Sequence, residues 1–74
     1  MGNDGLAKLD NYQMQRLVGG GKIRQGGLPL DIRNGEIARV SGPDKTQAVV
    51  EVGSVWCDFE KGRTTATLRL IEEI

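Results

Sequence analysis

The chain has 74 residues, one cysteine and no histidine, and its ten basic residues balance ten acidic ones. A chain of this length builds one core, a single cysteine excludes an intramolecular disulfide, and the lack of histidine excludes an ordinary zinc site and a histidine-based catalytic triad. The zero net charge removes the usual long-range attraction to nucleic acid, and no apolar run is long enough to span a membrane.

The first 21 residues are predicted to form a short helix followed by a flexible, glycine-rich joint. Residues 1–5 are polar and should be frayed, and Asp4 can cap a helix over residues 6–17. Three consecutive glycines, Gly19 to Gly21, should end this helix. A disordered leader is the alternative, because an isolated helix of this length is marginal in water. Four apolar residues fall on one helical stripe: Leu6, Leu9, Met14 and Leu17.

Residues 22–40 are predicted to form an edge strand and then a hairpin. The edge strand covers residues 22–25 and is broken by Gly26-Gly27, and Asn34-Gly35 is a strong signal for a two-residue type I′ turn. That turn would pair Ile32 with Ile37 and place Ala38 and Val40 on the opposite face. Only one of these sets can join the core cleanly unless a bulge intervenes or the sheet curls. Residues 41–45 then read as a turn, with Pro43-Asp44 at the centre of type I.

Residues 48–70 alternate between apolar and polar side chains in three runs, which is typical of half-buried strands. We expect Gly53-Ser54 to be a two-residue turn and residues 60–63 a four-residue loop. With these turns, Cys57 faces Ala66 and Val55 faces Leu68. One apolar face then joins three strands, with these inward residues: Ala48, Val50, Val52, Val55, Cys57, Phe59, Ala66, Leu68 and Leu70.

No catalytic constellation stands out, and we expect neither enzymatic activity nor a cofactor or metal. Gly19-Gly20-Gly21-Lys22 has the wrong spacing and context for a phosphate-binding loop. Cys57 is the only conventional strong nucleophile, and its expected place in the core, without a basic neighbour, would leave it inert.

Trp56 is expected on the face opposite the core, across from Glu51 and Thr67 and diagonal to Arg69. An exposed tryptophan beside an arginine can form a recognition patch. The candidate site for a protein partner or for self-association therefore consists of Val49, Trp56, Thr67 and Arg69. The alternative is that the N-terminal helix or a second protomer covers Trp56.

A second candidate site is a basic patch near the N-terminus, where Arg16, Lys22 and Arg24 have no acidic neighbour in the sequence. Joined by Arg33 and Arg39, these side chains could contact nucleic-acid phosphates. The alternative is an ordinary solvated surface.

From Gly35 to Ile74 the chain resembles the YodC-like family of short uncharacterised bacterial proteins. The residues that carry the resemblance are Gly35-Glu36-Ile37-Ala38-Arg39, Ser41-Gly42-Pro43, Val49 to Val52, the Gly53 to Phe59 segment, and Gly62 before Thr67-Leu68. Lys45 and Gln47 depart from the methionine that follows the turn in that pattern, and the first 25 residues have no counterpart. The resemblance implies an SH3-like β-meander and supplies no activity.

The sequence therefore predicts one mainly β domain over residues 1–74, with a β-meander over residues 22–74. Its five antiparallel strands would curl into an SH3-like small barrel after a short N-terminal helix. We expect a cytoplasmic accessory protein of a bacterium or mobile element, without membrane contact. Its function would be to bind a protein or a second copy of itself, most simply as a dimer, and the alternative is nucleic-acid binding.

Overall fold

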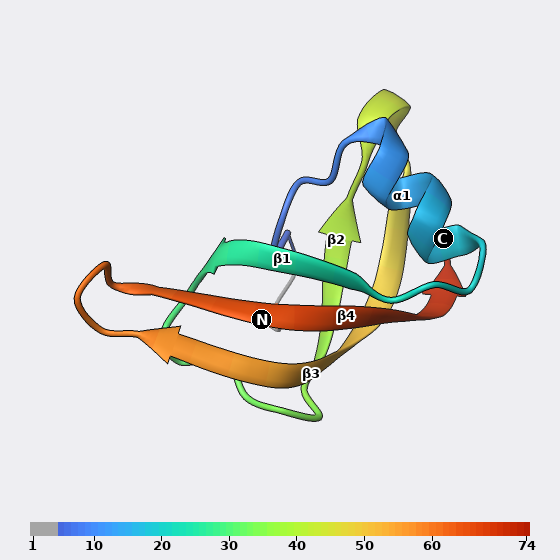
Figure 1. The fold of residues 1–74 in the computed structure, drawn as a ribbon. Helices are drawn as coiled ribbons and strands as arrows, with labels where there is room; N and C mark the ends of the chain where they lie inside the picture. Colours follow the sequence, from blue (N-terminus) through green and yellow to red (C-terminus); the bar gives the residue numbers. More distant parts are fainter. Residues whose placement is uncertain (1–4) are drawn as a thin grey trace.

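The computed structural model of the chain describes residues 5–74. It contains one helix and one four-stranded antiparallel sheet with the strand order β1-β4-β3-β2 (Figure 1). The elements are α1 (Asn11–Val18), β1 (Ile23–Leu28), β2 (Ile37–Ser41), the short 3-10 turn η1 (Pro43–Lys45), β3 (Gln47–Asp58) and β4 (Arg63–Glu73). The mainly β fold with one short helix is confirmed. The sheet is open, with β1 and β2 at its edges, and has four strands where we expected five.

The helix begins later than predicted. Asp10 caps it: its carboxylate accepts from the Gln13 backbone N–H at 2.7 Å, and the Gln13 side chain accepts from the Asp10 N–H at 3.1 Å. This reciprocal capping box satisfies two helix-end donors, which makes Asp10 a better start than a cap at Asp4. Asp4 and the rest of the segment expected to be frayed, apart from Gly5, lie outside the described residues. The helix ends at Gly19, as the glycine run indicated.

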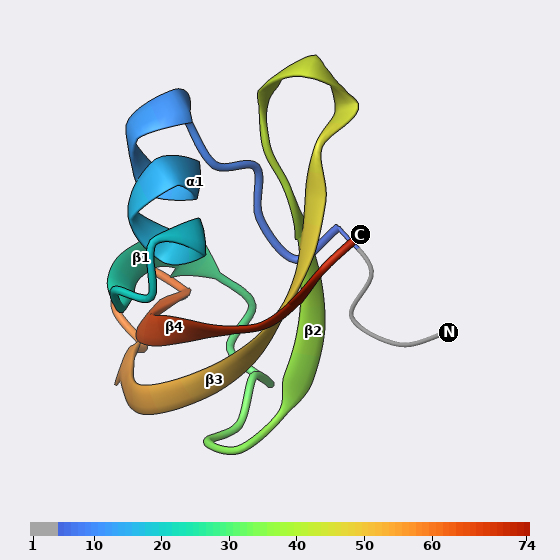
Figure 2. The ribbon, with the colours of Figure 1, turned by 90° about the vertical axis from the view of Figure 1, so that its right-hand side faces the viewer.

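Residues 6–9, which we call the strap, are extended instead of helical. The strap runs along the outer edge of β2, where Leu6 N–H donates to the Arg39 carbonyl at 2.9 Å and Leu9 N–H donates to the Ser41 carbonyl at 2.7 Å. In the other direction, the Ser41 N–H donates to the Ala7 carbonyl at 3.1 Å. In Figure 2 the strap descends from α1 towards β2. An edge strand presents unpaired backbone N–H and C=O groups. The hydrogen bonds that the strap makes to these groups of β2 stabilise the chain more than one additional helical turn would, because short helices are marginal in water.

Gly53-Ser54 lies within one long strand, where a bulge follows Gly53, so the predicted turn there is wrong. β3 pairs with β4 on both sides of it, with Gly53 opposite Thr67 and Trp56 opposite Thr65. The extra residue is accommodated where Ser54 adopts a positive φ of 49°. Two predicted strands are therefore one strand of 12 residues, which lowers the number of strands.

The register of the β3–β4 hairpin also differs from the prediction. Its loop has four residues, as expected, but occupies residues 59–62 between Asp58 and Arg63. Cys57 therefore pairs with Thr64 instead of Ala66, and Leu68 pairs with Val52. Glu51 lies in the same strand as Trp56 and pairs with Arg69, so the expected position of Glu51 opposite Trp56 is also wrong.

Asn34-Gly35 forms a turn but not the hairpin that we expected. Glu36 N–H donates to the Arg33 carbonyl at 3.2 Å, and Gly35 alone of the central pair has a positive φ, 87°, whereas type I′ requires two. The first strand, β1, continues through Gly26-Gly27 and ends at Leu28. Residues 29–36, which include the first strand of the expected hairpin, form a loop. The predicted conflict, in which Ile32 and Ile37 faced away from Ala38 and Val40, does not arise. Ile32 enters the core from a loop, Ala38 and Val40 are buried from β2, and Ile37 stays 51% exposed.

The turn predicted over residues 41–45 is confirmed, although its centre is not type I. Asp44 has φ 57° and ψ 36°, in the left-handed region. Gly42 is required there by close packing, since a Cβ would lie 2.6 Å from Met14 Cε and 2.7 Å from Thr46 Oγ1. The β2–β3 turn and α1 are thereby held together.

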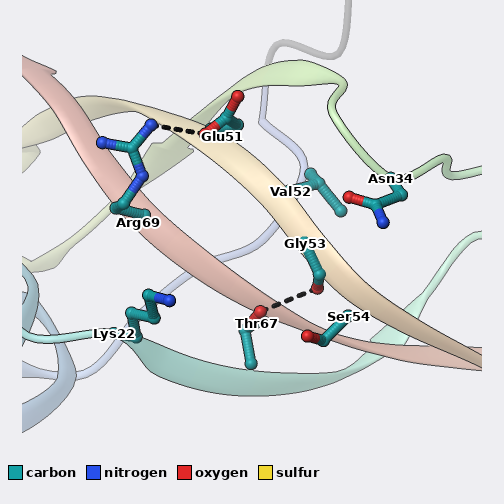
Figure 3. A pocket seen from close by; sticks show the side chains of 8 residues that line it. All are labelled: Lys22, Asn34, Glu51, Val52, Gly53, Ser54, Thr67 and Arg69. Carbon is teal, nitrogen blue, oxygen red and sulfur yellow. Dashed lines mark hydrogen bonds and ion pairs between the residues drawn. The ribbon is translucent and has the colours of Figure 1, made fainter.

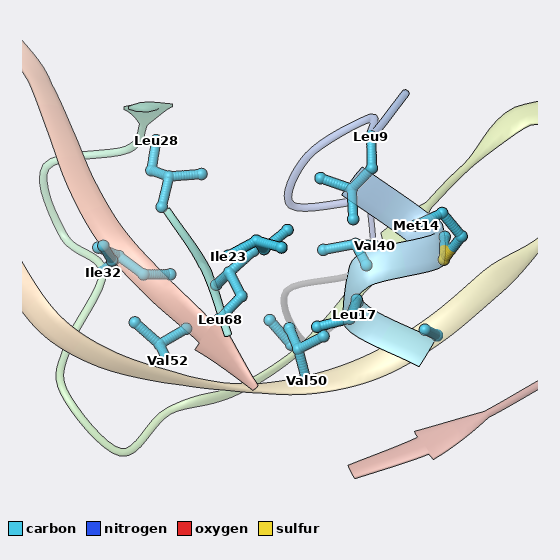
Figure 4. Packing of buried hydrophobic residues seen from close by; sticks show 13 residues of the cluster. Leu9, Met14, Leu17, Ile23, Leu28, Ile32, Val40, Val50, Val52 and Leu68 are labelled. Atoms are coloured by element: carbon cyan, nitrogen blue, oxygen red, sulfur yellow. The ribbon is translucent and has the colours of Figure 1, made fainter. Parts of the chain in front are cut away.

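The core lies between the sheet and α1 (Figure 4). We call the sheet face that carries Val50 and Val52 the inner face, and the opposite face the outer face. Cys57 and Phe59, which we expected in the core, are exposed. The buried apolar residues are Leu9, Met14, Leu17, Ile23, Leu28, Ile32, Ala38, Val40, Ala48, Val50, Val52, Ala66 and Leu68, with Val55 and Leu70 packed against them.

Candidate functional site

Trp56 lies on the outer face, and α1 does not cover it. Its side chain is 55% exposed, whereas the buried side chains of α1, Met14 and Leu17, belong to the core on the inner face. The helix therefore leaves the ring accessible, which corrects the alternative of a helix over Trp56.

An arginine does lie beside Trp56, but it is not the expected one. Arg24 Cζ is 5.1 Å from the centroid of the Trp56 ring, within the range of a cation–π contact. Arg69, the predicted neighbour, is instead ion-paired with Glu51 across β3 and β4. The sheet order explains the exchange: β1 lies next to β4, and Arg24 pairs with Thr67 there.

Next to Trp56, a groove of about 280 Å³ opens over Gly53; we call it the Gly53 groove (Figure 3). Gly53 and Val52 form part of its floor, and Figure 3 shows Lys22 approaching from one side and Asn34 from the other. Its lining is polar apart from these floor residues: Lys22, Asn34, Glu51, Ser54, Thr67 and Arg69. Such a lining suits a polar or charged ligand better than an apolar side chain.

The second groove lies between α1 and β1, and we call it the Tyr12 groove. It has a volume of about 360 Å³ and contains an exposed aromatic ring, Tyr12, but no carboxylate. Arg16 Nε donates to the Lys22 carbonyl at 3.4 Å, and Gln13 Nε2 donates to Gln25 Oε1 at 2.8 Å, so that the helix is tied to the start of the sheet. The lining residues are Tyr12, Gln13, Arg16, Lys22, Ile23 and Arg24.

Lys22 lines both grooves and connects the two sets of residues selected from the sequence. Arg16, Lys22 and Arg24 come together around the Tyr12 groove. Thr67 and Arg69 line the Gly53 groove, beside Trp56. The two sequence-predicted sites are therefore neighbouring parts of one surface along β1 and the outer face.

Three of the predicted site residues lie elsewhere. Arg39 is in β2, at the opposite edge of the sheet from β1, and Val49 pairs with it in β3, half-buried. Arg33 is in the turn before β2, where its backbone N–H donates to Glu36 Oε1 at 3.1 Å. None of the three lines either groove.

Sequence reasoning missed Tyr12, Asn34 and the role of Gly53. Tyr12 was passed over because the predicted helix boundaries gave it no special place. Asn34 was assigned to a hairpin turn, and Gly53 to another. Only the continuation of β3 through Gly53 creates a side-chain-free position on the outer face, and a glycine inside an alternating strand is the one signal that could have indicated it.

Cys57 is exposed near the end of β3 and accepts a weak hydrogen bond from Thr64 Oγ1 at 3.8 Å. Within residues 5–74, no three acidic or sulfur-bearing side chains gather as a metal site would require. The described part of the chain also has no helix of the length and apolarity needed to cross a membrane.

Comparison of the chain with protein-family models, with curated proteins and with solved structures gave no match. The resemblance to the YodC-like family thus stays a prediction, and the site is interpreted from its own geometry.

Proposed function

We propose that this protein is a small, non-catalytic binding module that uses the outer face and the adjoining edge of β1 to bind single-stranded nucleic acid. One observation carries the proposal: Trp56, 55% exposed, lies under the guanidinium of Arg24 and beside grooves lined by basic residues. Proteins that bind single strands combine exposed aromatic rings, on which bases stack, with cations that follow the phosphates.

The distribution of charge supports this ligand despite the zero net charge of the chain. Three cations and no carboxylate line the Tyr12 groove. In the Gly53 groove the one carboxylate, Glu51, is paired with Arg69. Local potential, not net charge, attracts a ligand at contact distance, because exposed charges farther than about 8–10 Å away are largely screened at physiological salt.

A protein partner or a second copy of this chain is the second candidate, and it was the one favoured by the sequence. Two exposed apolar side chains support it: Phe59, 78% exposed in the β3–β4 loop, and Ile37, 51% exposed on β2. Phe59 adjoins the Trp56 end of the sheet, whereas Ile37 lies on the far edge strand. A contact through Phe59 would extend the same surface into a protein interface.

The finer description of the fold is part of this proposal. We regard the curled four-stranded sheet as an SH3-like arrangement, supported by the short connections from β2 to β3 and from β3 to β4 and by the resemblance of residues 35–74. A bacterial host stays a prediction from the same resemblance, and a cytoplasmic location stays a prediction from the apolar pattern of the sequence.

The proposal is tested by fluorescence anisotropy with labelled oligothymidylate and oligouridylate at two salt concentrations. Trp56→Leu should weaken binding roughly 5- to 150-fold, because base–aromatic stacking contributes about 1–3 kcal/mol per base. Phe59→Leu is the matched control, an exposed aromatic outside both grooves, and should bind as the unchanged protein does. Absence of binding at low salt, together with a dimer in light scattering, would favour the second candidate.

A further inference from the structure

We infer that the Gly53 groove is a phosphate subsite, occupied by a backbone phosphate of a single strand whose adjacent base stacks on Trp56. This inference rests on the proposed function and names the part of the ligand that the groove recognises. The Tyr12 groove, which shares Lys22 with it, would carry the strand farther along β1.

The donors in the groove suit a phosphate. Among residues 5–74 the structure gives the Lys22 ammonium no carboxylate partner, whereas Arg69 is held by Glu51. Thr67 Oγ1 already donates to the Gly53 carbonyl at 2.7 Å, so it positions the two strands. The groups that remain to donate to oxygen atoms are the Lys22 ammonium and the Ser54 hydroxyl, which flank Gly53 in Figure 3. Asn34 turns its amide oxygen toward Gly53, so its NH2 group would donate to a phosphate only after the amide flips.

The absence of a side chain at Gly53 makes room for the phosphate. A Cβ there would project into the groove, 3.4 Å from Thr67 Oγ1 and 3.9 Å from Asn34 Oδ1. The neighbouring outward positions of β3 carry Glu51 and Trp56, so Gly53 is the one gap between a carboxylate held by Arg69 and the aromatic ring. A tetrahedral anion can therefore approach the strand at this position.

The spacing fits one strand of nucleic acid. Gly53 and Trp56 pair with Thr67 and Thr65, which are successive outward positions of β4 and therefore about 6–7 Å apart along the strand. A phosphate over Gly53 and a base on Trp56 can thus belong to the same or adjacent nucleotides. A base must leave its own stack before it can pack against Trp56, so a single strand should bind in preference to a duplex.

Gly53→Ala tests the subsite by filling it without straining the chain. Its φ lies outside the left-handed region and the added methyl makes only ordinary contacts, so thermal unfolding should be nearly unchanged. Binding of labelled oligothymidylate should weaken roughly tenfold, as expected for loss of a hydrogen-bonded charge. Gln47→Ala is the control: Gln47 is exposed at the opposite end of β3 from Trp56 and lines neither groove.

Lys22→Ala tests whether the Lys22 ammonium contributes electrostatically to phosphate binding. It should lower the slope of log affinity against log salt by about 0.7, the value for one phosphate contact on a single strand. Lys8→Ala, in the strap at the other edge of the sheet, should leave the slope unchanged.

Several outcomes would overturn the subsite. If Gly53→Ala binds as tightly as Gln47→Ala while Trp56→Leu is impaired, the strand is bound elsewhere on the face and the proposed function survives. Equal affinity for a duplex, or for an oligoglutamate peptide with the same dependence on Lys22, would replace the single strand by another anionic ligand. If no oligonucleotide binds, the subsite and the proposed function fail together.

Discussion

The two halves of β3 have similar alternating sequences and opposite environments. Before the bulge, Ala48, Val50 and Val52 are buried, and the strand is paired with β2 on one side and β4 on the other. After the bulge the strand pairs with β4 alone, Val55 is half-buried and Cys57 is exposed. Alternation therefore identifies the side to which a residue points, while burial requires a second layer or a neighbouring strand above it.

Removing part of that second layer should have the largest effect. Leu17, fully buried in α1, lies close to Val40 and Val50 in Figure 4. Leu17→Ala should lower the free energy of unfolding by roughly 2–5 kcal/mol, through lost burial and the remaining cavity. Urea denaturation measures this, and a loss below about 1 kcal/mol would show that α1 contributes little to the core.

The same substitution in both halves of β3 tests the comparison directly. Val50→Ala should cost about 2 kcal/mol, because Val50 is fully buried. Val55→Ala should cost less than about 1 kcal/mol, since Val55 is only partly covered. Thermal unfolding should separate the two variants by several degrees, as 1 kcal/mol shifts Tm by roughly 4–8 °C in a domain of this size. Equal losses would mean that the two halves are equally buried.

Asp10→Ala should loosen the helix that covers the first half. Loss of the cap at Asp10 should cost about 1 kcal/mol, because the Gln13 N–H loses its acceptor. Asp31→Ala, at an exposed loop carboxylate outside the helix, is the charge-matched control. A drop in Tm for both variants alike would point to net charge instead of the cap.

The smallest effect is expected at the end of the second half. Phe59→Ser should change the free energy of unfolding by no more than about 0.5 kcal/mol, since the side chain is 78% exposed. Chemical denaturation of the two proteins should give overlapping curves. A loss comparable to that of Val50→Ala would imply that Phe59 is buried in solution, as it would be within a dimer.

The candidate site shows the same division between residue type and position. Trp56 could be assigned to the outer face from alternation alone, and the basic character of Arg16, Lys22 and Arg24 could be read directly. The arginine that contacts Trp56 could not be identified from the sequence, because its identity depends on which strand lies beside β4. Arg24 and Trp56, 32 positions apart in the sequence, cannot be placed side by side across non-consecutive strands without the strand order. The Gly53 groove was hidden for a related reason: its floor was interpreted as a turn.

By itself, the sequence determined the inward positions of β4 and of the first half of β3, the end of the helix at the glycine run, and the mainly β character. These follow from local conformational preferences and from apolar periodicity, which act over a few residues. Only the tertiary structure decided that Gly53-Ser54 is a bulge, that residues 6–9 form a strap along β2, and that Arg24 lies over Trp56. Each of these choices is set by backbone groups or side chains distant in sequence, whose hydrogen bonds and contacts outweigh the local preference for a turn or a helix.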